Sequence, residues 1–323
     1  MKVALDVSPL RLTRAGSARY VGGLREALRG QVELEELAWG GGGRATAAAR
    51  DALWYPLALP RGARGADVLH CPTFRGPFRS PVPLVVTVLD LAVLRHPDLF
   101  NRWNRTYSRL AVPRVIRAAR RLIAISEFTK RELVDLLGVE PERVTVIGVP
   151  PKPGLTPDGP RADGEYVLAV GTLEPRKNLA RAAEAAARAG VELRVAGARG
   201  WGAISANGVT WLGEVDDDEL ARLLRGARAL VYPSLYEGFG IPILEAMSVG
   251  TPVVTSRGGS TEEVAGGAAV LVDPLDPASI AAGLDDADRR RDELRTLGLE
   301  RARAFAWDDV AARTLHVYRE AAR

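Results

Sequence analysis

Short apolar runs alternate with amphipathic segments along the first half of the chain. Residues 2–7, 67–70 and 83–89 are apolar runs bounded by turn residues, which is typical of buried strands. The segment Tyr20–Leu28 has the spacing of an amphipathic helix, and residues 144–150 form a further apolar run. Such an alternation predicts a parallel sheet with helices on both of its faces.

The second half of the chain repeats this pattern. Residues 166–170 read as a strand, residues 171–178 as a loop and residues 179–189 as a helix with Asn178 as its N-cap. Between the halves, residues 150–164 contain several prolines and glycines, as linkers often do. We therefore predict two doubly wound α/β domains joined at this linker.

The composition supports a globular protein with two domains. The chain has 323 residues, of which 47% are hydrophobic and 26% charged. The single cysteine, Cys71, excludes an internal disulfide and fits a reducing compartment. The first residues are charged too early for a signal peptide, and no apolar run approaches the ~20 residues that cross a bilayer. We expect a cytoplasmic protein, with attachment to the inner face of the membrane as an open alternative.

Positive charge is concentrated in the first half. Residues 1–150 hold 23 Lys and Arg against 14 Asp and Glu, whereas the rest of the chain holds 21 against 26. Residues 101–122 are rich in arginine with interleaved apolar residues, so this segment could lie on an acidic membrane surface or be a solvated helix that breaks near Pro113. No nucleic-acid-binding motif is present, and we expect no nucleic-acid partner.

Candidate chemistry is concentrated in residues 232–247, YPSLYEGFGIPILEAM. Gly238 and Gly240 precede a helix that has Pro242 near its start, and a helix N-terminus offers backbone N–H groups to an anion. Glu237 and Glu245 add carboxylates, which accept hydrogen bonds from sugar hydroxyls. A ligand that is part phosphate and part polyol fits both features, as a nucleotide sugar would. The alternative is a pair of acidic residues favoured by the helix dipole.

The spacing of these carboxylates within EGFGIPILEA resembles the signature of the retaining family-4 glycosyltransferases, which have the GT-B fold. The resemblance implies two facing Rossmann-like doubly wound domains, with a C-terminal helix that crosses back to the first. It implies that Glu237 contacts hydroxyls of the donor hexose and that Glu245 holds the ribose. The implied domains are an acceptor-binding domain, residues 1–155 with the helix at 307–323, and a nucleotide-sugar-binding domain, residues 156–306.

A second motif, GTLEPRKN at residues 171–178, carries two adjacent cations. Arg176 and Lys177 follow a glycine turn and precede a helix, where they can clamp a diphosphate. In the family this pair neutralises the departing diphosphate, so the resemblance makes Arg176, Lys177 and Glu237 the catalytic candidates. The acidic run at Asp216–Asp218 fits a helix cap, and we assign no metal site.

The resemblance also implies a wider donor-binding set. Gly16 resembles the glycine that approaches the donor phosphate in the family, although it could equally be a helix-entry glycine. The implied donor-binding residues are Gly16, Gly171, Gly197, Gly213, Val215, Gly238, Phe239, Gly240, Ile241, Leu244 and Glu245.

The acceptor side departs from the family. Many relatives have a histidine near the reacting sugar at the position that Leu89 occupies here. His70 ends one predicted strand and Asp90 follows another, so both should face the ligand crevice, because carboxyl ends of parallel strands line it. The role of the missing histidine is therefore vacant, unnecessary, or taken by His70 or His96. The acceptor-side candidates are His70, Asp90 and His96, with strand-end packing as the alternative for His70.

These features lead to one expected activity. The resemblance implies a metal-independent retaining hexosyltransferase of polysaccharide biosynthesis that uses a nucleoside-diphosphate sugar, and we expect no cofactor. A mannose-type hexose on GDP is favoured, with a UDP-linked donor as the alternative, and the acceptor is a hydroxyl of a saccharide, lipid-linked glycan or natural product. The competing interpretations are a non-catalytic nucleotide-sugar-binding subunit, which the Leu89 departure leaves open, and a nucleotide-sugar epimerase of the same fold.

Overall fold

The computed structural model describes residues 1–12, 16–40, 46, 49–100, 102–200 and 209–323. The chain forms two compact units. The first contains Met1–Val149 together with Ala306–Arg323, and the second contains Pro150–Phe305.

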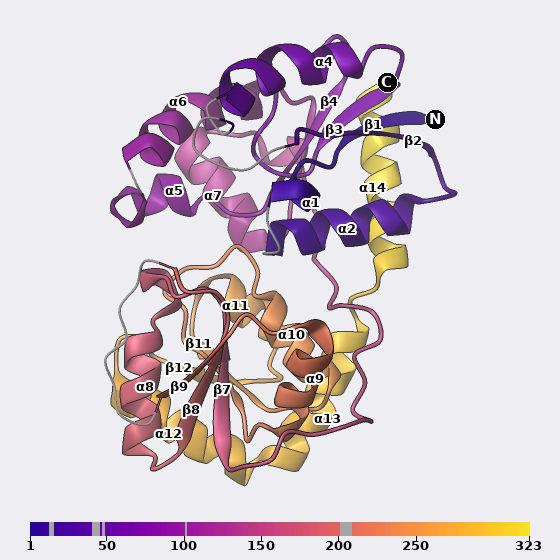
Figure 1. The fold of residues 1–323 in the computed structure, drawn as a ribbon. Coiled ribbons are helices and arrows are strands. Elements are labelled where there is room, and N and C mark those ends of the chain that lie inside the picture. Colours follow the sequence, from indigo (N-terminus) through magenta and orange to yellow (C-terminus); the bar gives the residue numbers. More distant parts are fainter. Residues whose placement is uncertain (13–15, 41–45, 47–48, 101, 201–208) are drawn as a thin grey trace. The chain divides into compact units, whose positions relative to one another are not determined.

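A six-stranded parallel sheet forms the centre of the first unit, in the order β2-β1-β3-β4-β5-β6 (Figure 1). Because β2 and β3 lie on opposite sides of β1, the chain reverses its direction of winding between β1 and β3, which is where ligands of open α/β sheets bind. The strands are β1 (Lys2–Asp6), β2 (Glu33–Leu37), β3 (Val68–Cys71), β4 (Leu84–Val88), β5 (Arg121–Ala124) and β6 (Val144–Val146).

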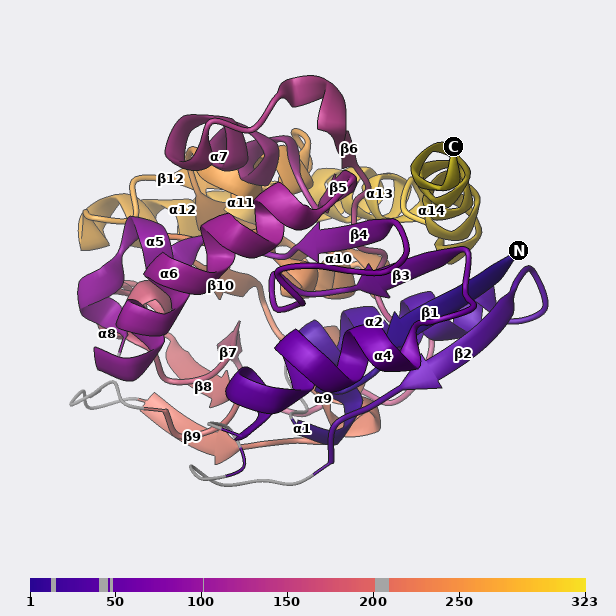
Figure 2. The same cartoon turned by 90° about the horizontal axis from the view of Figure 1, so that it is seen from above.

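Alternate residues of these strands face opposite sides of the sheet, and each side is covered. One face packs against the segment from η1 to α4 and against α6 and α7 in a single apolar cluster. Figure 2 shows the sheet from above with α4 and α6 lying over it. The helical segments of this unit before its terminal helix are α1 (Pro9–Leu12), α2 (Gly16–Leu28), the π-helical η1 (Arg50–Ala58), α4 (Leu59–Gly62), α5 (Ala92–Arg95), η2 (Pro97–Leu99), α6 (Arg102–Ala118), α7 (Glu127–Leu137) and η3 (Pro141–Arg143).

Helix α6 corrects one expectation. It continues through Pro113 without ending, and Val112, Val115 and Ile116 are buried in the core. The segment is therefore neither broken near the proline nor a purely solvated helix, because its apolar stripe packs on the sheet while Leu110 and several arginines stay exposed.

The last helix, α14 (Trp307–Ala322), packs on the first unit, as predicted from the resemblance. It lies beside α2 and against strands β3, β4 and β5 (Figure 1). Gly23 of α2 makes room for the ring of Trp307, which a Cβ at that position would overlap. The Tyr318 hydroxyl bonds Nδ1 of His70 at 2.7 Å, so α14 is joined to β3 by a polar contact as well.

The second unit has its own six-stranded parallel sheet, in the order β12-β11-β10-β7-β8-β9. Here the reversal point lies between β7 and β10, since β8 and β11 extend the sheet in opposite directions. Its strands are β7 (Tyr166–Val170), β8 (Glu192–Ala196), β9 (Val209–Gly213), β10 (Leu230–Tyr232), β11 (Val253–Ser256) and β12 (Val270–Val272).

Helices cover both faces of this sheet as well. Helices α8 and α12 share an apolar cluster with one face, and α9 and α10 pack on the strands of the sheet, with α13 against α10 (Figure 1). The helical segments are η4 (Pro175–Lys177), α8 (Leu179–Arg188), α9 (Asp217–Gly226), α10 (Ile241–Ser248), α11 (Gly259–Ala265), α12 (Pro277–Arg289) and α13 (Arg291–Arg303). Within the described part of the chain, no helix is both long and apolar enough to span a bilayer.

Candidate functional site

The three predicted catalytic side chains lie together at the reversal point of the second sheet. Arg176 and Lys177 belong to the loop after β7, and Glu237 belongs to the loop after β10. Strands β7 and β10 are neighbours, so both loops leave the same carboxyl edge of the sheet. This edge at a reversal point is the usual ligand position in an open α/β sheet.

Glu237 pairs with both cations at once. Its Oε1 lies 2.7 Å from Lys177 Nζ, and its Oε2 lies 2.9 Å from Arg176 Nη1. Lys177 also donates to the Tyr232 hydroxyl at 2.7 Å. The side chains of Glu237 and Lys177 are only 9% and 12% exposed, so these charges interact with little screening by water.

The electrostatics of the cluster follow from burial and from the pairing. Burial alone would raise the pKa of Glu237, but Lys177 and Arg176 outweigh it and lower this pKa to about 2. Burial lowers the pKa of Lys177, while Glu237 acts to raise it. Glu237 is therefore ionised at neutral pH and acts as an acceptor of hydrogen bonds rather than as a proton donor.

Further contacts hold the residues of the cluster in place. Arg176 Nε donates to Glu174 at 2.7 Å, and the Arg176 carbonyl accepts from the Leu235 N–H at 2.8 Å. The Glu237 carbonyl accepts from the Ser260 hydroxyl, again at 2.7 Å. The cluster is thus fixed through its backbone as well as through its charges.

Asn178 is the N-cap residue of α8, as predicted, but its side chain has a different role. Its side chain makes no N-cap hydrogen bond to α8, and its φ of 58° places it in the left-handed region. Its Nδ2 instead donates to the carbonyls of Pro233 and Pro274 at 2.9 and 2.6 Å. Asparagine tolerates this backbone conformation, and here its amide ties the loop after β7 to the loop after β10.

The glycine turn after Glu237 leads directly into α10. Gly240 has a φ of 114°, a conformation that residues with a Cβ rarely adopt, and it is the N-cap of the helix. Pro242 lies in the first turn, as predicted. The turn thus presents the N-terminal end of an eight-residue helix beside the Glu237 cluster.

Other predicted donor-binding residues differ in exposure. Leu244 is fully buried, Glu245 is 1% exposed and the Phe239 side chain is 4% exposed, whereas Ile241 is half-buried. The Phe239 ring packs edge-on against Phe305.

Three predicted glycines lie at the carboxyl edge of the second sheet. Gly171 follows β7, Gly197 follows β8 and Gly213 ends β9, and all three have positive φ. The Gly197 N–H donates to the Gly213 carbonyl at 2.7 Å, and a Cβ on Gly197 would overlap the Gly171 carbonyl oxygen. The backbones approach closely here because these residues lack side chains. Val215, also predicted for this edge, is half-buried just beyond β9.

The acidic run after β9 is a helix cap, as predicted. Asp216 is the N-cap of α9, and its side chain accepts from the Glu219 N–H at 2.8 Å. Among the residues that the structure describes, no group of three or more His, Cys, Asp or Glu side chains could hold a metal ion.

In the first unit, His70 does not face a crevice, and this expectation was wrong. His70 is fully buried, with Nδ1 bonded to Tyr318 and Nε2 bonded to the Thr87 hydroxyl at 2.9 Å. Thr87 in turn bonds the Tyr20 hydroxyl at 3.1 Å. Burial lowers the pKa of His70 to about 3, so the ring is neutral at neutral pH. The geometry favours the packing alternative.

The remaining candidates of the first unit are more accessible. Asp90 is half-buried after β4, and its Oδ1 accepts from the Ala92 N–H at 3.0 Å. His96 and Gly16 are exposed, and Gly16 is the first residue of α2. Their contacts with a ligand remain predictions.

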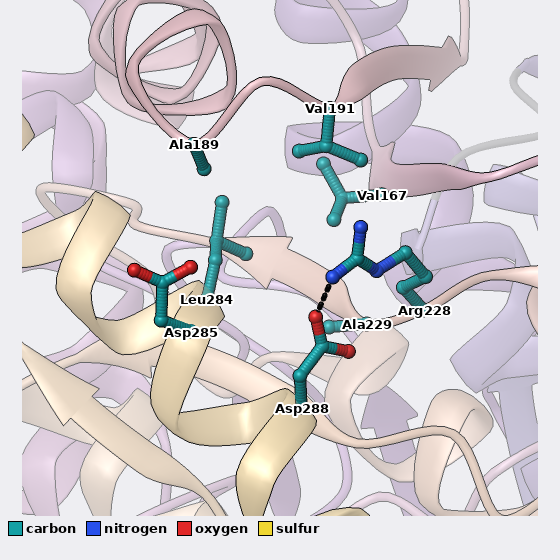
Figure 3. A pocket seen from close by; sticks show the side chains of 8 residues that line it. All are labelled: Val167, Ala189, Val191, Arg228, Ala229, Leu284, Asp285 and Asp288. Carbon is teal, nitrogen blue, oxygen red and sulfur yellow. Dashed lines mark hydrogen bonds and ion pairs between the residues drawn. The ribbon is translucent and has the colours of Figure 1, made fainter.

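A shallow hollow in the second unit lies at the opposite edge of the sheet from the cluster. Figure 3 shows its lining, in which Val167 lies near the amino end of β7 and Val191 lies just before β8. The guanidinium of Arg228 forms an ion pair with Asp288 inside it. The hollow is lined by this ion pair, by the carboxylate of Asp285 and by aliphatic side chains, and we do not assign a ligand to it.

Comparison with known proteins identifies the chain. A model of group 1 glycosyl transferases matches residues 157–300, and a model of glycosyltransferase family 4 matches residues 16–149. The O-antigen chain mannosyltransferase B of Escherichia coli is 30% identical over 283 residues, which cover 78% of this chain and 74% of that enzyme. The chain belongs to glycosyltransferase family 4. It is a hexosyltransferase that uses a nucleotide sugar, in a family known as retaining.

Other relatives of this glycosyltransferase match in sequence or in fold. The MMP α-(1→4)-mannosyltransferase of Mycolicibacterium hassiacum is 46% identical over 114 residues, which cover 33% of this chain and 28% of that enzyme. Sucrose-phosphate synthase from Thermosynechococcus elongatus superposes with a TM-score of 0.78 at 19% identity, covering 99% of this chain and 98% of that one. HepE from Anabaena, solved with UDP and glucose, has a TM-score of 0.71 at 19% identity, with 98% and 99% covered. The structural matches establish the GT-B fold.

The structure adds residues to the site of this glycosyltransferase that the sequence did not single out. Tyr232 bonds Lys177, Glu174 pairs with Arg176, and Ser260 bonds the carbonyl of Glu237. Glu174 and Tyr232 lie within the two motifs, so their closeness in sequence to the catalytic candidates could have identified them. Ser260 lies in α11, 23 residues after Glu237, and only the fold brings it to the cluster.

Proposed function

We propose that this enzyme transfers a mannose-type hexose from a nucleoside-diphosphate sugar to a hydroxyl acceptor, with retention and without a metal ion. GDP is the favoured nucleotide, with UDP as the alternative. The acceptor is a saccharide, a lipid-linked glycan or a natural product. The observation that carries this proposal is the buried cluster of Glu237, Arg176 and Lys177 beside the N-terminal end of α10.

The cluster is suited to both ends of such a donor. A diphosphate competes with Glu237 for Arg176 and Lys177, because phosphate oxygens form strong charge-assisted hydrogen bonds with both cations. Once the cations bind the diphosphate, the oxygens of Glu237 can accept hydrogen bonds from hydroxyls of the sugar. The ion pairs of Glu237 with Arg176 and Lys177 are thus replaced by contacts of the two cations with the diphosphate and of Glu237 with the sugar hydroxyls.

The same residues would stabilise the reaction. As the bond between the anomeric carbon and the phosphate oxygen breaks, negative charge builds on the leaving diphosphate. Arg176, Lys177 and the backbone N–H groups near Phe239 and Gly240 would stabilise it, since donors held in place before the reaction act on charge as it develops. The acceptor hydroxyl attacks from the side of the leaving group, which takes up its proton, so the configuration is retained.

The relatives support the proposed mannose-type sugar more strongly than they support GDP as the nucleotide. Two of the matched enzymes are mannosyltransferases, which supports a mannose-type donor. HepE was solved with UDP and glucose, which keeps a UDP-linked donor as the alternative. We place the reaction in the cytoplasm, with the basic first half of the chain available to an acidic lipid surface.

The test is donor hydrolysis in the absence of an acceptor. GDP-mannose, UDP-glucose, UDP-N-acetylglucosamine and dTDP-rhamnose are incubated separately with the enzyme and EDTA, and the released nucleoside diphosphate is measured. We expect GDP-mannose to be bound and slowly hydrolysed without metal. Preference for another donor would contradict the choice of sugar and nucleotide. Binding without release of any sugar, or activity only after metal is added, would contradict the catalytic or the metal-independent part.

A further inference from the structure

Phe239, in the middle of the glycine turn, is held by a side chain far along the chain. Its ring packs edge-to-face on Phe305, with ring centroids 5.8 Å apart and an interplanar angle of 84°. This is the arrangement that aromatic quadrupoles favour. Phe239 is 4% exposed, so its ring has little freedom to move away from this contact.

Phe305 is itself held by a second contact. The guanidinium of Arg301 lies 4.8 Å from the centre of the Phe305 ring, within the range of a cation–π interaction. Arg301 Nε donates to the Val264 carbonyl at 2.8 Å, and Nη2 donates to the Glu263 carbonyl at 2.9 Å. These carbonyls belong to the last turn of α11, where a cation is electrostatically favoured.

The close fit of Arg301 depends on a glycine. Gly266 follows α11 with a φ of 55°, and a Cβ there would come within 2.5 Å of Arg301 Nε. Burial lowers the pKa of Arg301, as expected of a guanidinium that is partly removed from water. Arg301 thus has a defined position between the end of α11 and the ring of Phe305.

Helix α11 therefore contacts the glycine turn through both of its ends. At its start, the Ser260 hydroxyl donates to the Glu237 carbonyl at 2.7 Å. At its end, the chain of contacts runs from Glu263 and Val264 through Arg301 and Phe305 to Phe239. The turn from Glu237 to Gly240 is held at two points, one through its backbone and one through its buried ring.

We propose that Arg301 and Phe305 are positioning residues for the donor: they fix the Phe239 ring and so hold the backbone of the Glu237–Gly240 turn where it meets the diphosphate and the sugar. The proposal rests on the proposed function, because it assigns a role toward the same site. Neither residue touches the donor. Their effect is on geometry, and small displacements of groups that contact a reacting ligand are costly in rate.

The experiment compares Phe305→Leu and Arg301→Ala with wild type. Binding of GDP, with UDP in a parallel titration, is measured by calorimetry, and kcat and KM are measured for hydrolysis of the preferred donor. We expect each variant to raise the Kd for the nucleotide and to lower kcat/KM by about tenfold, because the turn loses its second point of support. Phe305→Tyr keeps the ring and should restore values near wild type.

Two controls separate positioning from general loss of stability. Arg303→Ala removes an exposed arginine two residues further along α13 and should leave all constants unchanged. Trp307→Leu removes an aromatic that packs on Gly23 in the first unit, so it should lower the Tm without raising the Kd for the nucleotide.

The outcomes distinguish this inference from the proposed function. If wild type binds neither GDP nor UDP, the proposed function fails. If wild type binds and hydrolyses, but Phe305→Leu and Arg301→Ala retain its Kd and KM, the positioning role is overturned. A lower Tm with unchanged Kd and KM in these variants overturns it as well, since that is the result of a purely structural role.

Discussion

At the scale of the residue, Glu237 shows how a buried setting decides the behaviour of a carboxylate. The pairing with Lys177 and Arg176 outweighs burial, so the pKa of Glu237 falls to about 2. Asp6 of the first unit has the opposite setting. It is fully buried and bonded to Ser8, and burial raises its pKa to about 6. The first carboxylate is charged at neutral pH, while the second releases its proton only near neutrality.

Asp6 and His70 have opposite effects on the pH dependence of stability. Below pH 6 Asp6 is protonated in the folded chain, whereas in the unfolded chain it stays ionised until the pH falls to its ordinary pKa of 3.8. The folded state therefore binds more protons over this range, and Asp6 stabilises the fold as the pH falls. His70 stays neutral in the folded state down to about pH 3, whereas the unfolded chain takes up a proton below its ordinary pKa of about 6.5. His70 therefore destabilises the fold as the pH falls.

The variant Asp6→Asn should show these opposite effects of Asp6 and His70 on the pH dependence of stability. Removing Asp6 leaves the effect of His70 uncompensated, so the free energy of unfolding of the variant should fall relative to wild type by up to ~1.4 kcal/mol per pH unit between pH 6 and 4. Urea unfolding at pH 4, 5, 6 and 7 measures it. Asp98→Asn, whose side chain is 93% exposed, provides the baseline. An equal difference between Asp6→Asn and wild type at every pH would refute the argument.

Single residues were predictable where their chemistry is local. Arg176, Lys177 and Glu237 were selected from two short motifs, and the structure brings their side chains together. His70 was predicted to face a crevice because it ends a strand. Strand alternation instead directs its side chain toward α14, where it forms a hydrogen bond with Tyr318. Helix α14 lies almost 250 residues further on, and no local pattern could indicate that contact.

At the scale of the element, the buried strands were easier to predict from the sequence than the exposed ones. The central strands were predicted because both of their faces are apolar. Strand β2 has the sequence ELEEL and was not predicted, since it is a polar edge strand that becomes ordered by pairing with β1. The proline in α6 suggested a break that does not occur, because tertiary packing of the apolar stripe outweighs the loss of one hydrogen bond.

The packing of α14 on α2 provides a test at this scale. Gly23→Ala should destabilise the protein by ~1–3 kcal/mol, because the new methyl group overlaps the ring of Trp307 and one of the two must move. Gly22→Ala is the matched control in the same helix. Its new Cβ meets Leu10 Cδ2 at 3.6 Å, an ordinary contact, so the better helix propensity of alanine should leave stability unchanged or up to ~1 kcal/mol higher.

Equilibrium unfolding in urea compares these two variants with wild type. Equal stability of Gly23→Ala and Gly22→Ala would show that Trp307 does not pack on Gly23, and the account of how α14 is held on the first unit would then be wrong.

At the scale of the whole molecule, the repeated alternation of strands and helices was sufficient to predict two doubly wound sheets. The EGFGIPILEA and GTLEPRKN motifs then pointed to glycosyltransferase family 4, and the comparisons establish membership of that family. The donor sugar and the acceptor were less predictable. They depend on the shape of loops and on contacts of many side chains, which spacing in the sequence does not specify.

The central claim is that the diphosphate of the donor replaces Glu237 as the ion-pair partner of Arg176 and Lys177. It is tested most directly by comparing nucleotide binding with sugar release in Glu237→Gln and Lys177→Ala. Calorimetry gives the Kd for GDP, or for UDP if the donor panel selects a uridine donor, and donor hydrolysis gives the rate. Glu184→Gln, an exposed carboxylate on α8, is the control.

We predict that Glu237→Gln binds the free nucleotide at least as tightly as wild type, since the competing carboxylate is gone, while hydrolysis falls by about a hundredfold or more. Lys177→Ala should weaken nucleotide binding and slow hydrolysis together. Weaker nucleotide binding by Glu237→Gln, or unchanged binding by Lys177→Ala, would contradict the account.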